Sequence, residues 1–482
     1  MGRAAILVAG ALLVLAAPAR ANTLQVGPGK TYAKPCAAFA AANAGDTVEI
    51  DAAGNGTYDG DVCAFNKNDL TIRGVNGRAR IDAAGQNSQG KAIWVIQGSS
   101  TVVENVELSG CAVADKNGAG IRQEGPNLTV RGCYFHDNEN GILTGANAQS
   151  EILIETSEFA NNGAGDGYSH NMYIGHVGKF TLRYSYSHHA KIGHLVKSRA
   201  AQNFILYNKL IDAADGTASY ELDLPNGGTS YVIGNVIQQG PATDNPTLLA
   251  YREENGAAEN PGTDLYVVNN TFVDERSPAG LFIRVNSTTP AVIKNNIFRG
   301  AGNVTDQGNA DLANNLVKTD PLFASAATFD YHLLTGSPAI NAGADPGTGG
   351  GFALAPSFQY VHPASFEARP SDGTLDLGAF EFGVGIPPDA GAPAGPDATT
   401  AVVPDSGTVA GADAAQGQPA DAQTSVAGDA AVVQSGDAGT ISKADGGDSQ
   451  AVDAGCGCSS APAAGGLGLV LLALGLLRKR SS

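Results

Sequence analysis

The sequence predicts an all-β solenoid in which short strands stack as successive coils. A short apolar stretch followed by a small or polar residue recurs as TVVEN, LTVRG, ILIET, FTLRY, FILYN, YVIGN, YVVNN and AVIKN. The residues that close these segments are Asn105, Gly132, Thr156, Tyr184, Asn208, Asn235, Asn270 and Asn295. Their spacing stays between 24 and 28 residues, apart from one interval of 35. Periods of this length indicate a repeat architecture.

The repeats themselves predict strands and turns. Each contains β-branched alternation bounded by Gly, Asn and Asp, and none contains a convincing amphipathic helical pattern of about ten residues. Residues 24–382 therefore resemble a single-stranded right-handed parallel β-helix of the pectate-lyase-like class. The phrases DPLF, GSPAINAG and DLGAFEF resemble those that close many such helices. We expect the stacked residues Asn208, Asn235, Asn270 and Asn295 to form an internal asparagine ladder.

The first 21 residues predict export. Arg3 precedes an apolar run from Ala4 to Ala17, and the small-residue pattern Ala19-Arg20-Ala21 follows, as in a secretory signal peptide. The folded domain is then expected over residues 22–384. Residues 385–455 are rich in Ala, Gly, Pro, Asp and Ser and contain no aromatic residue. Such a segment buries too little apolar surface to fold, which predicts a disordered acidic spacer.

The C-terminal residues 456–482 predict an anchor. Cys456 and Cys458 precede an apolar stretch from Ala461 to Leu477, which ends in Arg478-Lys479-Arg480. A stretch of this length is at the lower limit for a spanning helix. The tail resembles the C-terminal sorting signal of myxobacterial surface proteins, and a plain membrane anchor is the alternative. Both interpretations place the folded domain at the cell surface or outer envelope.

The remaining cysteines and the charge limit the partners. Cys36, Cys63, Cys111 and Cys133 form an even set in an oxidising compartment, which favours disulfides between Cys36 and Cys63 and between Cys111 and Cys133. The formal net charge is −18. Because phosphate binding needs a basic surface, nucleic acid is excluded as a partner. We expect a monomer that meets an acidic polysaccharide through local cations.

Ionisable and aromatic side chains are concentrated around residue 197. Five of the eight histidines lie between His170 and His194, directly before Lys197 and Arg199. Alternation along VKSR places Val196 and Ser198 on one face and Lys197 and Arg199 on the other. Tyr173, Lys197 and Glu221 are 24 residues apart, which predicts one outward row, with Asp223 beside Arg199. Tyr220, Leu222 and Leu224 are expected to face inward.

The grouping resembles polysaccharide lyases of the chondroitinase B and alginate lyase type. That resemblance implies β-elimination from a uronate, with Lys197 as the base and Arg199 or Arg252 as the group that binds the carboxylate. His170, His194 and Tyr173 are the second-choice acid and base groups. The same resemblance implies a Ca²⁺ ion held by oxygen ligands. The candidate calcium ligands are Glu221, Asp223, Glu253 and Glu254.

Three other interpretations stay open. The first is that the patch is an outward charge ladder that only solvates and stabilises a sheet. A non-catalytic surface protein that binds sugars, adheres or forms a stalk would also use the anchoring tail. A polygalacturonase-like hydrolase would use paired carboxylates, for which Asp166 and Asp212 are isolated candidates. The long interval after Gly240 predicts loops that wall a groove beside Lys197.

Overall fold

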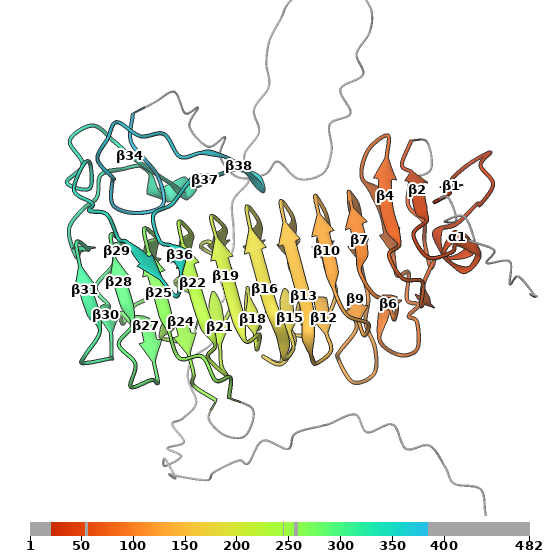
Figure 1. Ribbon diagram of the computed structural model, residues 1–482, viewed down its shortest axis with the longest axis horizontal. Helices are drawn as coiled ribbons and strands as arrows, with labels where there is room; N and C mark the ends of the chain where they lie inside the picture. The colour runs from red at the N-terminus through yellow and green to blue at the C-terminus, as the bar shows by residue number, and fades with distance from the viewer. Residues whose placement is uncertain (1–20, 54–55, 244, 255–258, 384–482) are drawn as a thin grey trace, which may run out of the picture. The chain divides into compact units, whose positions relative to one another are not determined.

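Three parallel β-sheets run along the described part of the chain, and most coils add one strand to each of them (Figure 1). The structure is a computed structural model that describes residues 21–53, 56–243, 245–254 and 259–383. Sheet A has 12 strands, and sheets B and C have 10 strands each. Neighbouring strands of each sheet come from successive coils and pair in parallel. The predicted all-β parallel solenoid is confirmed, with about ten turns.

The strand bounds are as follows. Sheet A contains β1 (Thr23–Val26), β2 (Thr47–Asp51), β4 (Thr71–Val75), β7 (Thr101–Glu104), β10 (Leu128–Arg131), β13 (Asn147–Glu155), β16 (Val177–Arg183), β19 (Gln202–Leu206), β22 (Thr229–Ile233), β25 (Leu265–Val268), β28 (Val292–Lys294) and β31 (Asp311–Ala313). Sheet B contains β5 (Ala79–Asp82), β8 (Val106–Ser109), β11 (Tyr134–His136), β14 (Glu158–Ala160), β17 (Tyr186–His188), β20 (Lys209–Ile211), β23 (Val236–Gln239), β26 (Thr271–Asp274), β29 (Ile297–Arg299) and β32 (Leu316–Val317). Sheet C contains β3 (Cys63–Phe65), β6 (Ala92–Ile96), β9 (Ala119–Gln123), β12 (Asn140–Thr144), β15 (Met172–Ile174), β18 (Lys197–Ser198), β21 (Leu222–Leu224), β24 (Thr247–Tyr251), β27 (Leu281–Val285) and β30 (Asn303–Thr305).

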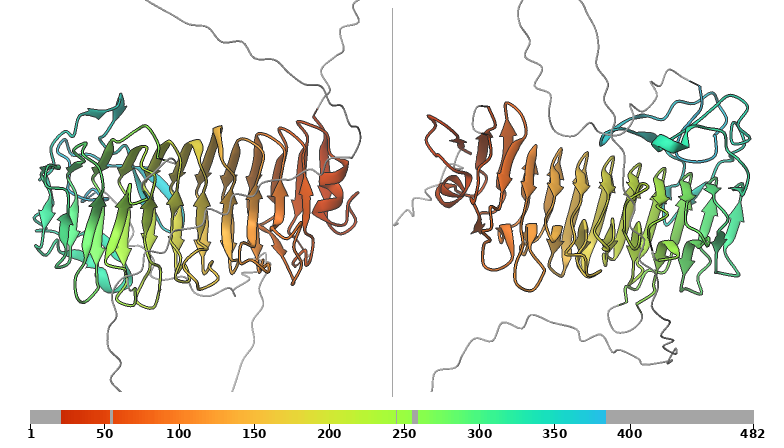
Figure 2. Two further views of the ribbon diagram at one scale, coloured as in Figure 1. Left: turned by 90° about the horizontal axis from the view of Figure 1, so that it is seen from below. Right: turned by 180° about the vertical axis from the view of Figure 1, so that it is seen from behind.

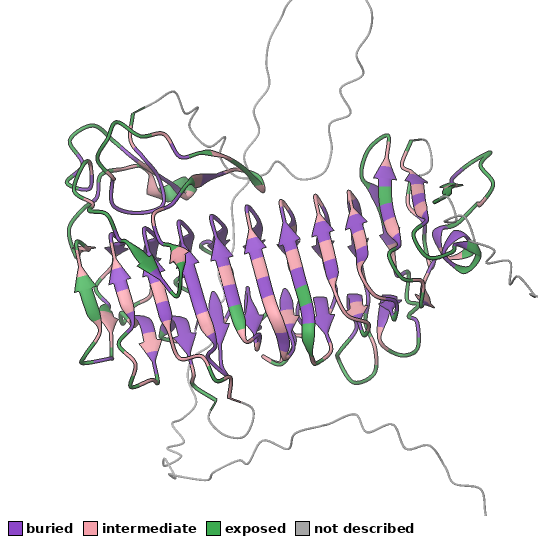
Figure 3. Ribbon diagram, in the orientation of Figure 1, coloured by how far each residue is buried: buried purple, intermediate pink, exposed green. Residues whose placement is uncertain are grey.

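The repeated apolar segments all fall on sheet A, and their alternate residues fill the interior. One inward column contributes a fully buried side chain from each of eight strands, which Figure 3 shows as buried segments. Its members are Val103, Val130, Ile154, Leu182, Ile205, Val232, Val267 and Ile293. Successive members lie on neighbouring strands ~4.8 Å apart, so apolar burial stabilises every coil against the next.

A ladder of buried asparagines follows the corner between sheets A and B. Each side-chain amide donates to the carbonyl oxygen of the next asparagine side chain, over 2.9–3.1 Å. The ladder contains Asn208, Asn235, Asn270, Asn296 and Asn315. The prediction is confirmed for its first three members and wrong for Asn295. That side chain contacts Asn269 and the carbonyl of Ala344 instead, because the inward position of this coil is one residue later.

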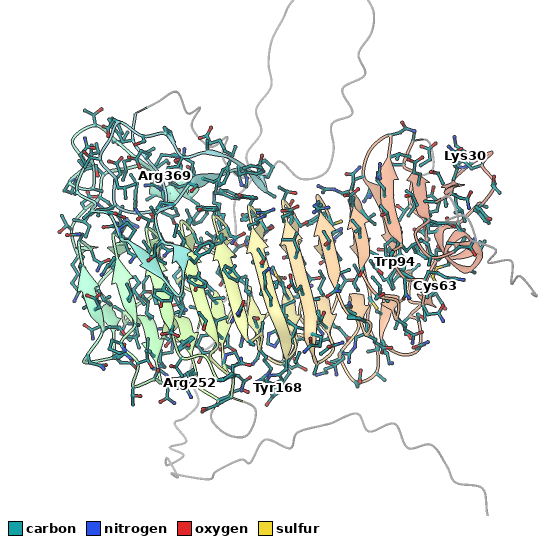
Figure 4. All side chains as sticks on the ribbon, viewed as in Figure 1. Lys30, Cys63, Trp94, Tyr168, Arg252 and Arg369 are labelled. Atoms are coloured by element: carbon teal, nitrogen blue, oxygen red, sulfur yellow. A yellow bond between two sulfur atoms is a disulfide. The ribbon has the colours of Figure 1, made fainter. Side chains whose placement is uncertain are left out.

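The N-terminal end is closed by a short helix and one disulfide. Helix α1 (Pro35–Ala41) packs against β1, β2 and β3, and its Phe39 ring lies 5.2 Å from the ring of Trp94. The predicted disulfide between Cys36 and Cys63 is confirmed, with a Cα–Cα distance of 5.9 Å. Cys63 pairs with Trp94 across neighbouring strands (Figure 4). Trp94 is fully buried and belongs to the core.

The predicted disulfide between Cys111 and Cys133 is wrong. Both thiols are free and buried. Cys111 follows strand β8 and its backbone amide donates to Asn138, whereas Cys133 precedes strand β11 and its amide donates to Ser157. The two residues therefore occupy opposite ends of sheet B strands, although they are close in sequence. Burial raises the pKa of each thiol to about 12.

The residues after β32 fold back along the solenoid, as the views in Figure 2 show. They form the 3₁₀ helix η1 (Ala326–Thr328) and three antiparallel hairpins. The hairpins pair β33 (Phe323–Ser325) with β34 (Asp330–Leu333), β35 (Thr348–Gly349) with β36 (Phe352–Ala353), and β37 (Phe358–Val361) with β38 (Ser365–Ala368). Asn269 and Tyr231 of the solenoid donate hydrogen bonds to carbonyls of Asp376 and Gly349. The buried pair of Arg369 and Glu381, 2.7 Å apart, lies within this region.

The predicted signal peptide over 1–21, the spacer over 385–455 and the C-terminal anchor over 456–482 lie outside the described residues, apart from residue 21. Within the part that the structure describes, no helix is long and apolar enough to cross a membrane.

Candidate functional site

The candidate site residues lie on the outer face of sheet C. Lys197 lies there between paired residues of the two neighbouring strands. Lys197 on β18 pairs with Tyr173 on β15, as the 24-residue spacing predicts. On the other side Lys197 pairs with Asp223 on β21, so the row continues through Asp223 and not through Glu221. Val196 and Ser198 are fully buried, which confirms the predicted faces of this strand.

The misplacement of Glu221 has a local cause. Strand β21 begins only at Leu222, and the chain still turns the corner from sheet B at residues 220 and 221. Strict alternation applies within a strand and not around a corner. Leu222 and Leu224 point inward as expected, whereas Glu221 is fully buried and the Tyr220 ring lies outside against His194, 4.9 Å between ring centres.

Lys197 lies between two carboxylates. Its Nζ is 3.2 Å from Asp223 Oδ2 and 3.2 Å from Glu254 Oε1. The Asp223 side chain is only 5% exposed, whereas that of Glu254 is 49% exposed. Burial alone would lower the pKa of Lys197, but the two carboxylates outweigh it and hold that pKa above its ordinary value. Lys197 is therefore a cation in the free protein.

Arg199 is fixed by three polar partners. Its Nε donates to Tyr173 Oη at 2.7 Å, and its Nη1 lies 2.6 Å from Glu254 Oε2 and donates to Asn226 Oδ1. Burial opposes the charge of the guanidinium, but Glu254 and Tyr173 outweigh it and raise the pKa of Arg199. The sequence carries no signal for the contact between Asn226 and Arg199, other than the place of Asn226 one coil beyond Arg199.

Two histidines line the buried edge of this patch. His170 Nδ1 accepts the backbone N–H of His194 at 3.0 Å, and the two rings lie 4.3 Å apart. His194 Nδ1 is also 3.2 Å from Asp223 Oδ2. Burial lowers the pKa of both imidazoles, that of His170 well below its ordinary value. Both are therefore neutral near pH 7, and they position Asp223 and the Tyr173 ring.

The inserted segment borders the patch, as predicted, through Glu254. Part of it, residues 247–251, forms strand β24 of sheet C and is not a loop. Beyond this strand, Arg252 (labelled in Figure 4) pairs with Glu259. Gly227, with φ at +68°, leaves room for Arg252, because a Cβ there would lie 2.4 Å from Arg252 Cγ. This close approach favours glycine at residue 227 in addition to its positive φ.

The four candidate calcium ligands are not brought together. Glu221 is inside the solenoid, and Glu253 lies 3.7 Å from Arg284. Asp223 and Glu254 both contact the Lys197 ammonium, which competes with a metal ion for the same oxygens. Among the described residues, no three His, Cys, Asp or Glu side chains are grouped to hold a metal ion. This donor set does not fit a Ca²⁺ ion.

Glu221 belongs to a buried acidic pair with Asp212. Both are fully buried, and burial raises the pKa of Glu221 well above its ordinary value and that of Asp212 to about 7. Asp212 Oδ2 accepts the backbone N–H of Ala218 at 2.9 Å. Because Asp212 is fully buried, it cannot act with Asp166 as the carboxylate pair of a hydrolase.

We expect the substitution Asp212→Asn to stabilise the protein increasingly as pH rises. As pH rises, an unfolded aspartate releases its proton near its pKa of about 3.9, whereas Asp212 in the folded protein keeps its proton to a higher pH. The corresponding stability is present below about pH 4 and is lost as pH rises through about 7. Urea unfolding should show that Asp212→Asn is more stable than the wild type by a margin that grows by about 2–3 kcal/mol between pH 5 and pH 8. An advantage independent of pH would contradict the assignment.

Comparison with known proteins supports the fold. A family model described as a right-handed β-helix region matches residues 63–237. The fold is a right-handed parallel β-helix. A search of curated proteins found no match. A crystal structure of pectate lyase Pel9A is similar, with a TM-score of 0.52 and 18% identity over 75% of this chain and 96% of that chain.

Two more distant structures carry the names of other polysaccharide-acting enzymes. Alginate lyase from Paenibacillus sp. str. FPU-7 has a TM-score of 0.39 and 14% identity over 62% of this chain and 99% of that chain. Pectin methylesterase from Aspergillus niger has a TM-score of 0.24 and 11% identity over 63% of this chain and 88% of that chain. At 18% identity, the similarity to pectate lyase Pel9A shows the fold alone.

Proposed function

We propose that the protein cleaves an acidic polysaccharide by β-elimination on the outer face of sheet C. The observation that carries this proposal is the grouping of Lys197, Arg199 and Tyr173, in which Arg199 donates to Tyr173 and shares the Glu254 carboxylate with Lys197. Two cations and a phenol are the groups that elimination next to a uronate carboxylate needs. The similar fold of a protein named a pectate lyase supports the same substrate class.

Each group has a distinct role in the proposed reaction. Arg199 binds the uronate carboxylate and neutralises the charge that develops on it. Lys197, in its neutral form, takes the proton from the carbon next to that carboxylate, and the electron pair forms a carbon–carbon double bond as the glycosidic C–O bond breaks. Tyr173 Oη accepts from Arg199 and can give its own proton to the leaving oxygen. Asp223 positions Lys197.

The charge on Lys197 favours a second candidate function. A lysine whose pKa is raised by neighbouring carboxylates is a good partner for a sugar carboxylate and a poor base at neutral pH. A non-catalytic protein that binds acidic glycans would use the same patch. The two candidates differ in whether a product with a new double bond appears, and an elimination that uses Lys197 should become faster as the medium becomes more alkaline.

The sequence supports the cellular setting of either function. We propose that residues 1–21 direct export and that residues 456–482 attach the protein to the cell surface or outer envelope, as their composition predicts. A polysaccharide outside the cell would then be accessible to sheet C.

Absorbance near 235 nm tests the proposed reaction, because it reports the unsaturated uronate product. The protein is incubated with alginate, pectate and glycosaminoglycans between neutral and alkaline pH, with added Ca²⁺ and with a chelator. We expect a rise with at least one polyuronate and no loss of the rise in chelator. The absence of a rise with every substrate, from protein that unfolds cooperatively, would overturn the lyase function and leave the binding function.

A further inference from the structure

Glu254 differs from the other polar groups around Lys197 and Arg199. Asp223 and Tyr173 lie on strands of sheet C, whereas Asn226 and Glu254 follow the ends of β21 and β24. Its backbone N–H donates to the carbonyl of Pro225 at 3.0 Å, which fixes its place above the patch. Its side chain is half exposed, so it closes the solvent side of the two cations.

The carboxylate of Glu254 bridges the two cations with one oxygen each. Oε1 lies 3.2 Å from Lys197 Nζ, and Oε2 lies 2.6 Å from Arg199 Nη1. A uronate carboxylate is the same chemical group with the same charge and the same two acceptor oxygens. Any uronate that pairs with both cations must therefore meet the position that Glu254 already fills.

We infer that Glu254 occupies the carboxylate subsite of the patch and that a uronate binds there by displacing it. This inference rests on the proposed function and identifies the chemical group that its site recognises. The exchange replaces one carboxylate with another, so the charge around Lys197 and Arg199 is unchanged. Glu254 then competes with every acidic sugar and sets the affinity, while a neutral sugar has no group to replace it.

Neighbouring cations show the same pattern on a smaller scale. Arg252 pairs with Glu259, and Arg284 lies 3.7 Å from Glu253. The carboxylates of residues 253, 254 and 259 thus each contact a cationic side chain. These cations lie on a strand of sheet C or just after the end of one. Glu254 is the member that contacts the groups proposed to act on substrate, which is why the test is directed at this residue.

The test compares the wild-type protein with Glu254→Gln and Glu254→Ala in binding short oligogalacturonates and oligomannuronates by calorimetry. A matched control is Glu151→Gln, which removes a 66% exposed carboxylate 3.1 Å from Lys179 on sheet A. We expect both Glu254 variants to bind at least one of these oligouronates with a Kd at least about tenfold lower than the wild type, by loss of the internal competitor. The Glu151 control should leave the Kd unchanged. An equal or higher Kd in both Glu254 variants would overturn the inference.

Product absorbance measured in parallel separates this inference from the proposed function. Tighter binding by the Glu254 variants without any product from any protein would support the inference and remove the lyase reaction. Product formation by the wild type without tighter binding in the variants would support the reaction and overturn the role of Glu254. Failure of the wild type and of both variants to bind either oligouronate, together with no product from any polyuronate, would overturn both.

Discussion

Replacing Lys197 with arginine should lower kcat for β-elimination by a factor of about 10³ or more, with a smaller change in KM. General base catalysis contributes about 10²–10⁴ in rate, and a guanidinium cannot act as a base near neutral pH. Arginine keeps the positive charge that Asp223 and Glu254 require, so the fold and carboxylate binding should be retained. Rates of product formation at saturating and limiting substrate measure the two effects separately.

The control for this substitution is Lys179→Arg on sheet A, where Lys179 pairs with the exposed Glu151. Its activity should equal that of the wild type. The pH dependence gives a second readout, because the raised pKa of Lys197 predicts a rate that keeps rising into the alkaline range. If His170 or His194 were the base, their lowered pKa values would give a rate that levels off below about pH 6.5. A Lys197→Arg enzyme within tenfold of the wild type would contradict the assigned base.

Replacing Asn235 with alanine should destabilise the solenoid by about 3 kcal/mol or more. Asn235 Nδ2 donates to the carbonyl of Ile205 at 2.8 Å and to Asn270 Oδ1 at 2.9 Å. Its Oδ1 accepts both the backbone and the side-chain N–H of Asn208, at 2.9 Å each. Each buried polar group left without a partner costs about 1–3 kcal/mol, and alanine leaves several. The midpoint and slope of urea unfolding measure the loss.

Asn309→Ala is the matched control for the ladder, because Asn309 is exposed and donates only one hydrogen bond, to the carbonyl of Thr288. It should cost no more than about 0.5 kcal/mol. A loss at Asn235 as small as that at Asn309 would show that the ladder contributes little to stability.

The sequence predicts the solenoid well because every coil repeats the same alternation of apolar residues. The segments TVVEN to AVIKN all became strands of sheet A, and their alternate residues form one buried column. The pairing of Tyr173 with Lys197 followed from the same alternation and from a coil of 24 residues. The contact of Glu254 with the patch followed from the long interval after Gly240.

The errors occur where the chain turns between sheets, because corner lengths vary from coil to coil. Asp223 rather than Glu221 pairs with Lys197, since the corner before β21 is longer than the preceding one. The cysteines at 111 and 133 lie at opposite corners of sheet B. Asn295 is a different kind of error, because the phrase AVIKN is aligned one residue too early: Val292 and not Ala291 pairs with Tyr266, which places Asn296 in the ladder. The carboxylates proposed for Ca²⁺ were grouped by sequence proximity, whereas in the structure two of them contact Lys197, one contacts Arg284 and one lies in the core.

The most direct test of the account is a crystal structure of the Lys197→Arg protein with the oligouronate that the wild type cleaves. We expect a sugar chain on the outer face of sheet C, with one carboxylate within hydrogen-bond distance of Arg199 and the Glu254 side chain moved away from it. A sugar chain bound to the outer face of sheet A or sheet B would contradict the assigned site.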